Sequence, residues 1–337
     1  MDPSVPIERR YILNTKRKLW LDIAKGIGII SVVIGHAGIE SLSPYFYWFH
    51  MPLFFLISGY LYKRTNHFVT RKTKSLLIPY VSFFVLLSVL QFYTFGISDF
   101  NIHYEYFLKG GRYLKGTFGV LWFITSLYVL SVIFHMLILL NSKIVLFIVA
   151  ITFYFLSYYD SIHFNDVFVI WDINTILFTF VFYYIGYLYK EYESKISHLI
   201  SKAAFPSALL IIVLIFLNIR GLFVYKLDIK NQVYNHLFID IGVPLLFVIF
   251  VFWISNKLEV VKGLNKTLSI IGESSLTIMY LHIFLLTLFA TYTHMDTWLI
   301  IFMSIIIPTI IHQLFKASRI TSLIFLGIQS KQKPPIT

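Results

Sequence analysis

The sequence contains no cysteine and few charged residues. None of its 337 residues is Cys, and 13% are Asp, Glu, Lys or Arg, whereas a typical soluble domain has about 25%. The lack of cysteine excludes disulfides, thiolate nucleophiles and zinc–thiolate sites. The scarcity of charge, with 58% hydrophobic and 19% aromatic residues, predicts an integral membrane protein surrounded by lipid.

The few charges that are present are mostly basic. The chain has 28 Lys and Arg against 16 Asp and Glu, a net charge of +12. Nucleic-acid binding is one interpretation of such an excess. Cytoplasmic loops of membrane proteins are also rich in Lys and Arg, and this second interpretation is favoured here. We therefore expect no nucleic-acid partner.

Apolar segments recur along the chain at about 17–23 residues each, the length that crosses a bilayer. They predict an all-α integral membrane protein with about ten transmembrane helices, near 20–39, 45–63, 76–96, 117–140, 143–159, 170–189, 204–220, 236–254, 268–290 and 297–315. With the N-terminus inside, 21 of the 28 Lys and Arg fall on the cytoplasmic side and six outside. Both termini are therefore predicted to be cytoplasmic. The expected parts are a tail (1–18), the membrane domain (19–316) and a short basic tail (317–337) of a multi-pass cell-membrane protein.

The first apolar segment, LDIAKGIGIISVVIGH, holds a lysine and a histidine 11 residues apart. On an α-helix this spacing is three turns plus about 20° and a rise of roughly 16 Å. Lys25 and His36 therefore share one stripe, near opposite ends of a span. Asp22 lies within about 60° of that stripe and is expected to pair with Lys25. Ionisable groups at membrane depth are costly, so each should have a partner or a function.

Further polar residues fall at the outer depth of His36. His50 lies near the start of the returning segment and is expected to face the same cavity. Trp122, Asp172 and Asp240 each lie near the outer start of a descending segment. Two interpretations stay open for these three: contacts to a substrate, or an interfacial tryptophan and aspartates at a helix N-cap or in a first turn.

The ninth segment contains Glu273 and His282. Nine residues apart, they point to opposite helix faces unless the helix is broken near Gly272–Ser275. His282 is expected either to line a pore and contact substrate or to be a hydrogen-bonded core histidine.

Two outer loops and one inner basic group complete the polar pattern. The loops 97–116 and 220–235 mix acidic, amide, tyrosine and basic residues, which suits sugar binding and is also typical of any solvated loop. The inner group is Arg71, Lys72 and Lys74. It is either a positive-inside anchor or a receptor for phosphates.

Several motifs together resemble one family. The segments LDIAKGIGIISVVIGH, FHMPLFFLISGYLYKR, RKTKSLLIPY, LWFITSLYV and SSLTIMYLH occur in the order seen in membrane acyltransferases of the acyltransferase-3 type. The resemblance covers roughly residues 17–290, and FHMPLFF is most similar to the fucose O-acetyltransferase-like branch. The family usually has an arginine where this chain has Lys25, a change that keeps the charge and loses the bidentate fork.

The resemblance implies transfer of an acyl group, usually acetyl, from cytoplasmic acyl-CoA to a hydroxyl of a surface glycan or its lipid-linked precursor. It implies His36 as the catalytic histidine, Lys25 as the basic residue at the donor, and Asp22 as the acidic residue before it. The basic patch after the second span corresponds to Arg71, Lys72 and Lys74. Acetyl-CoA is thus the expected donor, no metal is expected, and a homo-oligomer is left open.

The chemistry of these residues fits acyl transfer in more than one way. His36 suits a general base that deprotonates the acceptor hydroxyl, or a nucleophile that forms an acyl-histidine. His50 would orient His36, stabilise the oxyanion or relay the proton. The alternative class is a transporter or flippase for a glycan or anion, because intramembrane His and Lys also mark proton relays.

Overall fold

The computed structural model describes residues 18–96, 104–165, 167, 169–234 and 236–328. Over these residues the regular structure is helical, apart from an isolated bridge between Asp228 and Val233. The predicted all-α class is therefore confirmed. Residues 1–17, 97–103 and 329–337 lie outside the described residues, so the predicted sidedness of both termini stays a prediction.

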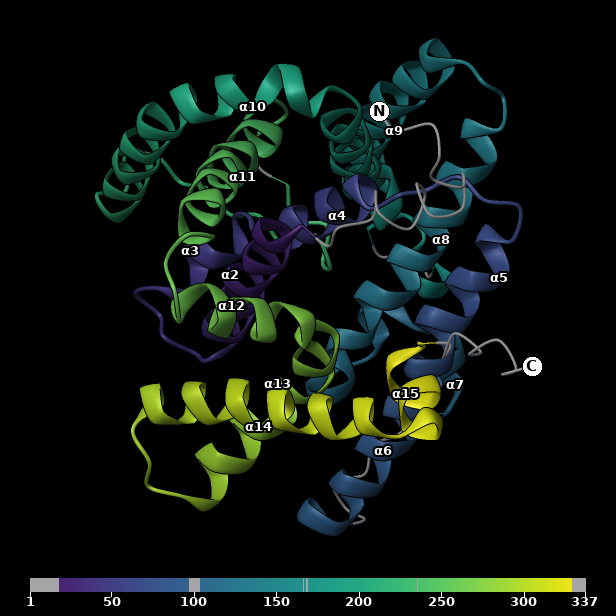
Figure 1. Ribbon diagram of the computed structural model, residues 1–337, viewed down its shortest axis with the longest axis vertical. Coiled ribbons are helices and arrows are strands. Elements are labelled where there is room, and N and C mark those ends of the chain that lie inside the picture. Colours follow the sequence, from purple (N-terminus) through teal and green to yellow (C-terminus); the bar gives the residue numbers. More distant parts are fainter. Residues whose placement is uncertain (1–17, 97–103, 166, 168, 235, 329–337) are drawn as a thin grey trace, which may run out of the picture.

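Figure 1 shows the helices in chain order. They are α2 (Leu19–His36), α3 (Ser43–Tyr47), α4 (His50–Tyr60), α5 (Phe68–Lys72), α6 (Ile78–Phe95), α7 (Tyr104–Lys109), α8 (Trp122–Ile138), α9 (Lys143–His163), α10 (Thr175–Ile219), α11 (Ile239–Leu258), α12 (Leu264–Glu273), α13 (Ser275–Tyr292), α14 (Thr297–Ala317) and α15 (Arg319–Leu326). Tighter or wider turns join some of them: the π-helical η1 (Thr73–Leu77) and the 3-10 turns η3 (Gly111–Tyr113), η4 (Gly116–Leu121) and η5 (Ile170–Asp172).

Within the described part of the chain, eight helical stretches are long and apolar enough to cross a membrane. They cover nine of the predicted segments, because the stretch Ile170–Ile219 includes both 170–189 and 204–220. Its helix α10 continues through the polar residues between them and arches along one edge of the molecule (Figure 1). The remaining segment, 45–63, is divided at Trp48–Phe49 into the short helices α3 and α4.

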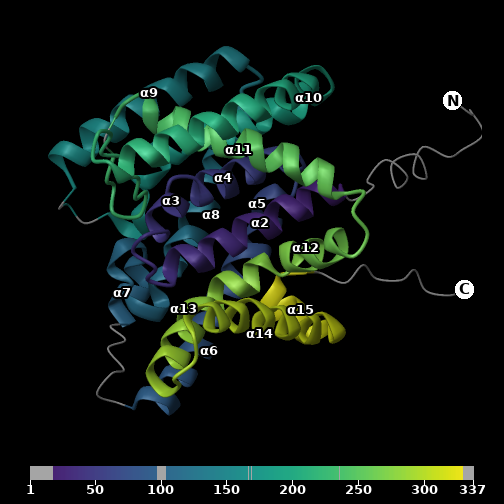
Figure 2. The ribbon, with the colours of Figure 1, turned by 90° about the vertical axis from the view of Figure 1, so that its left-hand side faces the viewer.

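Helix α2 occupies the interior of the assembly. It packs against α12, α11, α13, α4 and α3, and Figure 2 shows it between the group α9–α11 and the group α13–α15. Because it is surrounded by protein, its polar stripe faces other helices rather than lipid, as intramembrane ionisable residues require.

Paired glycines bring α2 and α12 into close contact. A Cβ added at Gly272 would lie 1.8 Å from the carbonyl oxygen of Asp22, and one at Gly26 would lie 2.3 Å from that of Leu268. Small residues allow such close backbone approach between membrane helices. The contact fixes the part of α2 that carries Asp22 and Lys25.

We expect Gly272→Ala to destabilise the protein by about 1–3 kcal/mol, because the new methyl group meets backbone rather than a mobile side chain. Thermal unfolding of the purified protein in detergent measures the effect. The matched control is Gly242→Ala in α11, where a Cβ would meet nothing within 4 Å and alanine is the better helix former. Equal unfolding temperatures for the two variants would contradict the close contact.

The described ends of the chain lie on one side of the molecule. The start of α2 and the end of α15 both lie toward the right of Figure 2. Lys18, just before α2, forms an ion pair with Glu193 of α10 and hydrogen-bonds Tyr60 at the end of α4. Gly327, just after α15, packs against Ser75. This is the side that the basic residues of the sequence assign to the cytoplasm.

Candidate active site

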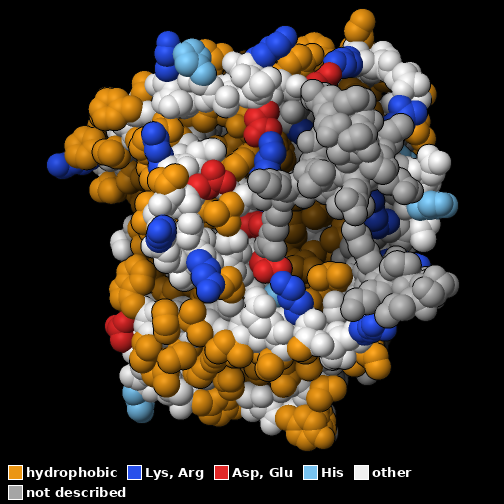
Figure 3. Space-filling model, in the orientation of Figure 1, with side chains coloured by type: hydrophobic (Ala, Val, Ile, Leu, Met, Phe, Trp, Pro, Cys, Tyr) orange, Lys and Arg blue, Asp and Glu red, His pale blue; other side chains and the backbone are white. Residues whose placement is uncertain are grey.

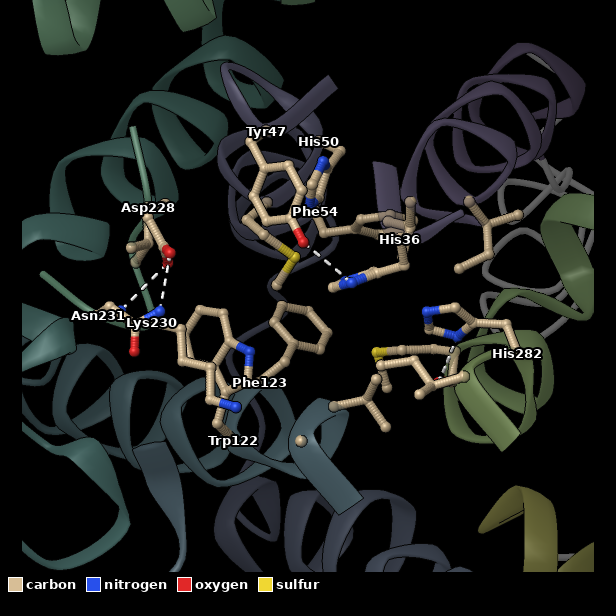
Figure 4. A pocket seen from close by; sticks show the side chains of 18 of the residues that line it. His36, Tyr47, His50, Phe54, Trp122, Phe123, Asp228, Lys230, Asn231 and His282 are labelled. Carbon is tan, nitrogen blue, oxygen red and sulfur yellow. Dashed lines mark hydrogen bonds between the residues drawn. The ribbon is translucent and has the colours of Figure 1, made fainter. Parts of the chain in front are cut away.

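A cavity of about 210 Å³ lies at the end of α2 that is predicted to face outward (Figure 4). It is formed by α2, the α3–α4 region, η4 with the start of α8, the loop before α11, and α13. Its lining includes Ile29, Val32, His36, Tyr47, His50, Met51, Phe54, Trp122, Phe123, Leu227, Asp228, Ile229, Lys230, Asn231, Met279, His282 and Ile283. The cavity therefore joins segments that are far apart in the sequence.

The structure brings His36, His50 and His282 together at one end of this cavity. The ring centroids of His50 and His282 lie 6.3 Å and 5.2 Å from that of His36. The expectation that His36 and His50 face one cavity is confirmed. His282 of α13 joins them. Glu273, at the end of α12, binds Lys316 of α14 at 2.5 Å and does not line the cavity, so the two residues point to different places although the helix is interrupted at Ser274.

Hydrogen bonds to backbone fix how two of these imidazoles present themselves. His50 Nδ1 lies 2.6 Å from the carbonyl oxygen of Phe46, and His282 Nδ1 lies 2.8 Å from that of Met279. A carbonyl oxygen only accepts, so each ring donates from Nδ1, and Nε2 of the neutral ring is an acceptor. Nε2 of His282 has no partner among the described residues and lies on the His36 side in Figure 4. Nε2 of both rings is thus suited to accept a hydrogen bond from a hydroxyl group.

His36 itself is held by Tyr47. The Tyr47 hydroxyl lies 2.9 Å from His36 Nδ1, and the two rings meet edge to face with centroids 5.4 Å apart. When Nδ1–H donates to the phenol oxygen, Nε2 carries the free lone pair that a general base needs. The sequence did not single out Tyr47, although it lies in the aromatic run YFYWFH that also contains His50.

The opposite end of the cavity is formed by the loop before α11 (Figure 4). Asp228 accepts hydrogen bonds from the backbone N–H of Asn231 at 3.1 Å and from its side-chain amide at 2.8 Å. Lys230 Nζ donates to the carbonyl oxygen of Leu114 at 3.0 Å. Burial lowers the pKa of Lys230, and the carboxylates of Asp172 and Asp228 oppose this shift. The polar composition of 220–235 indicated this loop, but not these residues.

Aromatic rings line the cavity between its two ends. Trp122 and Phe123, at the start of α8, lie between the histidines and the loop, with Phe54 nearby (Figure 4). Trp122, predicted to lie at the depth of His36, thus lines the same cavity, and its contact with a substrate stays a prediction. A flat aromatic face beside hydrogen-bonding groups is an arrangement that suits an amphipathic ring-shaped ligand.

Two predicted substrate contacts, Asp172 and Asp240, do not line this cavity. Asp172 pairs with Arg112 at 3.2 Å. Asp240 accepts a hydrogen bond from the Tyr158 hydroxyl at 2.5 Å and another from the His236 backbone at 2.9 Å. Both carboxylates thus join outer connections to the helices. Neither side chain is an N-cap; Asp172 lies in the first turn of η5 and Asp240 in the first turn of α11, which agrees with the first-turn interpretation. A substrate contact for either residue stays a prediction.

At the opposite end of α2 the expected ion pair is present. Lys25 Nζ lies 2.6 Å from Asp22 Oδ1, and the side chains are 22% and 5% exposed. Lys25 does not line the cavity, but Ile29 and Val32 of the same helical stripe do. The cavity therefore extends from His36 toward Lys25 and ends about one helical turn short of it.

The molecular surface is hollowed near the centre of the face that carries the start of α2 (Figure 3). Hydrophobic side chains form the floor of this hollow, and acidic and basic side chains stand at its rim. In the same orientation, α2 and α12 lie on one side of it and α5 on the other (Figure 1). Arg71 of α5 and Lys74 of η1 are exposed, whereas Lys72 of α5 is half-buried with its ammonium 5.9 Å from the Phe68 ring centre.

No group of three or more His, Asp or Glu side chains in the described ranges is placed to hold a metal ion. The fold and the cavity define a helical multi-pass membrane protein with a buried histidine-lined pocket. A family model described as an acyltransferase domain, of the acyltransferase-3 type, matches residues 18–315. The chain belongs to this family of acyltransferases.

Curated relatives are similar over shorter stretches. Nodulation protein NolL of Sinorhizobium fredii is 33% identical over 154 residues, which cover 38% of this chain and 39% of that protein. Nodulation protein NolL of Mesorhizobium japonicum is 38% identical over 96 residues, 23% of this chain and 26% of that protein. The matched region thus spans well under half of either relative. No solved structure matches the chain at a significant level.

Proposed function

We propose that the chain is a membrane O-acyltransferase that moves an acyl group, expected to be acetyl, from cytoplasmic acyl-CoA to a hydroxyl of a surface glycan or its lipid-linked precursor. Family membership supports the reaction class. The observation that carries the proposal is the cavity around His36, which follows the α2 stripe toward Lys25. The fucose O-acetyltransferase-like branch is part of the proposal.

The donor would enter at the hollow on the face that carries the start of α2. Its phosphates would meet Lys25 and the exposed Arg71 and Lys74, because basic side chains bind phosphate by charge-assisted hydrogen bonds. The thin pantetheine arm would then follow the stripe toward His36, a distance of roughly 16 Å along the helix. Asp22 would keep Lys25 charged and oriented.

The acceptor hydroxyl would react at His36. Nε2 takes the hydroxyl proton as the oxygen attacks the thioester carbonyl; the new C–O bond forms, the C–S bond breaks, and the proton passes to the leaving CoA thiolate. Because Nε2 of His50 and His282 are acceptors in the neutral rings, they suit orientation of acceptor hydroxyls better than stabilisation of an oxyanion. An acyl-histidine on His36 is the second route compatible with this geometry.

We expect Tyr47→Phe to lower kcat about 3–10-fold, since a neutral hydrogen bond contributes about 1 kcal/mol. Tyr47 is a positioning residue, so the KM for donor and acceptor should change less than kcat. Tyr45→Phe is the matched control: it removes a hydroxyl from the same short helix, but Tyr45 does not line the cavity. A kcat equal to that of the wild type in Tyr47→Phe would contradict the positioning role.

The proposal is tested with purified protein, acetyl-labelled acetyl-CoA and surface glycan from cells that lack the chain. Appearance of the label on the glycan, with stoichiometric release of CoA, supports the acyltransferase. Uptake of glycan or anion into proteoliposomes without cleavage of the thioester would instead select a transporter, the alternative that the intramembrane His and Lys suggest.

A further inference from the structure

A second cavity, of about 470 Å³, adjoins the histidine cavity on its outer side. It lies between the connection from α2 to α4 and the loop before α11. Tyr47, Leu227 and Asp228 line both cavities. These three side chains therefore form a common wall, and the Tyr47 hydroxyl that holds His36 belongs to it.

The lining of the second cavity combines an aromatic floor with polar groups. Trp48 is buried, and its indole N–H has no acceptor among the described residues. Glu40 and Lys226, of opposite charge, are exposed along the lining. An indole ring with hydrogen-bond donors and acceptors beside it suits a neutral polyhydroxylated ring. Such a ring offers apolar faces to the indole and many hydroxyls to the polar groups.

We propose that this outer cavity binds the saccharide unit next to the one that is acylated. The acceptor is then an oligosaccharide or a glycan end of at least two units, with Tyr47 and Asp228 beside the linkage between them. The inference rests on the proposed function. The shared wall with the His36 cavity supports it. When one saccharide unit is bound in the outer cavity, the unit linked to it can lie in the His36 cavity.

The dependence of the rate on acceptor length tests the inference. The probe is a series of oligosaccharides of one, two, three and four units, prepared from the surface glycan that loses O-acyl groups when the chain is deleted. With purified full-length protein and labelled acetyl-CoA, kcat/KM should rise about tenfold from one unit to two, equivalent to ~1.4 kcal/mol. It should change little beyond two units. Equal kcat/KM for one and two units would overturn the inference.

A blocking variant locates the effect. Glu40→Trp places a bulky ring on an exposed position that lines the outer cavity, and Ser41→Trp places the same ring on the next residue, which is exposed and does not line it. Glu40→Trp should lower kcat/KM for two-unit acceptors to the one-unit value and leave the one-unit value unchanged. Ser41→Trp should keep the full dependence on length.

Two results distinguish failure of this inference from failure of the proposed function. Equal loss for every acceptor length in Glu40→Trp would overturn the outer subsite while the acyltransferase stands. No transfer of label to any glycan by the wild-type protein, with the thioester intact, would overturn the proposed function and the subsite with it.

Discussion

Replacement of His36 with alanine is expected to lower the rate of acyl transfer at least about 100-fold, the contribution typical of a general base. His36 is the imidazole around which His50, His282 and Tyr47 are grouped. Nδ1 of His50 and of His282 each bind a backbone carbonyl oxygen. Nδ1 of His36 instead lies beside the Tyr47 hydroxyl. The initial rate of label transfer from acetyl-CoA to glycan measures the effect.

The His36→Ala experiment needs a control for folding and for the loss of a histidine as such. His198→Ala removes an exposed histidine of α10 that does not line the cavity, and it should leave the rate unchanged. Both variants should keep the wild-type unfolding temperature within a few degrees. A His36→Ala protein that transfers label at half the wild-type rate or more would refute the assignment of the base.

Replacement of Lys25 with alanine is expected to raise the KM for acyl-CoA about 10–100-fold, because hydrogen bonds to charged groups contribute roughly 1.5–3 kcal/mol. Lys25→Arg should retain more activity, since it keeps the positive charge. The KM for the acceptor should change little in both variants, because the acceptor is proposed to bind near the other end of α2.

A loss of stability has to be separated from a loss of donor binding at this site. Lys25→Ala removes the ion pair between Lys25 and the buried Asp22 carboxylate, and loss of a buried ion pair is destabilising in itself. The double variant Asp22→Asn/Lys25→Met removes both charges and should recover stability without recovering donor affinity. Equal loss of donor affinity in Lys25→Arg and Lys25→Ala would show that the charge of Lys25 does not contact the donor.

The sequence predicts the α2 stripe well because helix geometry is local. The spacing of Asp22, Lys25 and His36 determines their relative directions once the segment is helical, and the ion pair at one end and the cavity at the other follow. Depth in the membrane likewise predicts that His50 and Trp122 lie at the level of His36. Depth does not specify direction, and for this reason Asp172 and Asp240, predicted at a similar depth, do not line the cavity.

Residues that depend on the path of a loop were not predictable in this way. Lys230 and Asn231 reach the cavity because the loop before α11 folds back at the bridge between Asp228 and Val233. Tyr47 reaches His36 because the second segment breaks before His50. Hydropathy also reports apolar length and not helix continuity, so two predicted spans proved to be one helix, α10.

The most direct measurement is of sidedness in sealed proteoliposomes whose protein orientation has been determined. Labelled acetyl-CoA is placed on the side of Lys18 and the start of α2, and glycan on the side of Tyr47 and the α2–α4 connection. The label should appear on glycan across the bilayer, and this transfer should be lost in His36→Ala. Transfer that occurs only when donor and glycan share one side would contradict a donor route along α2 from Lys25 to His36.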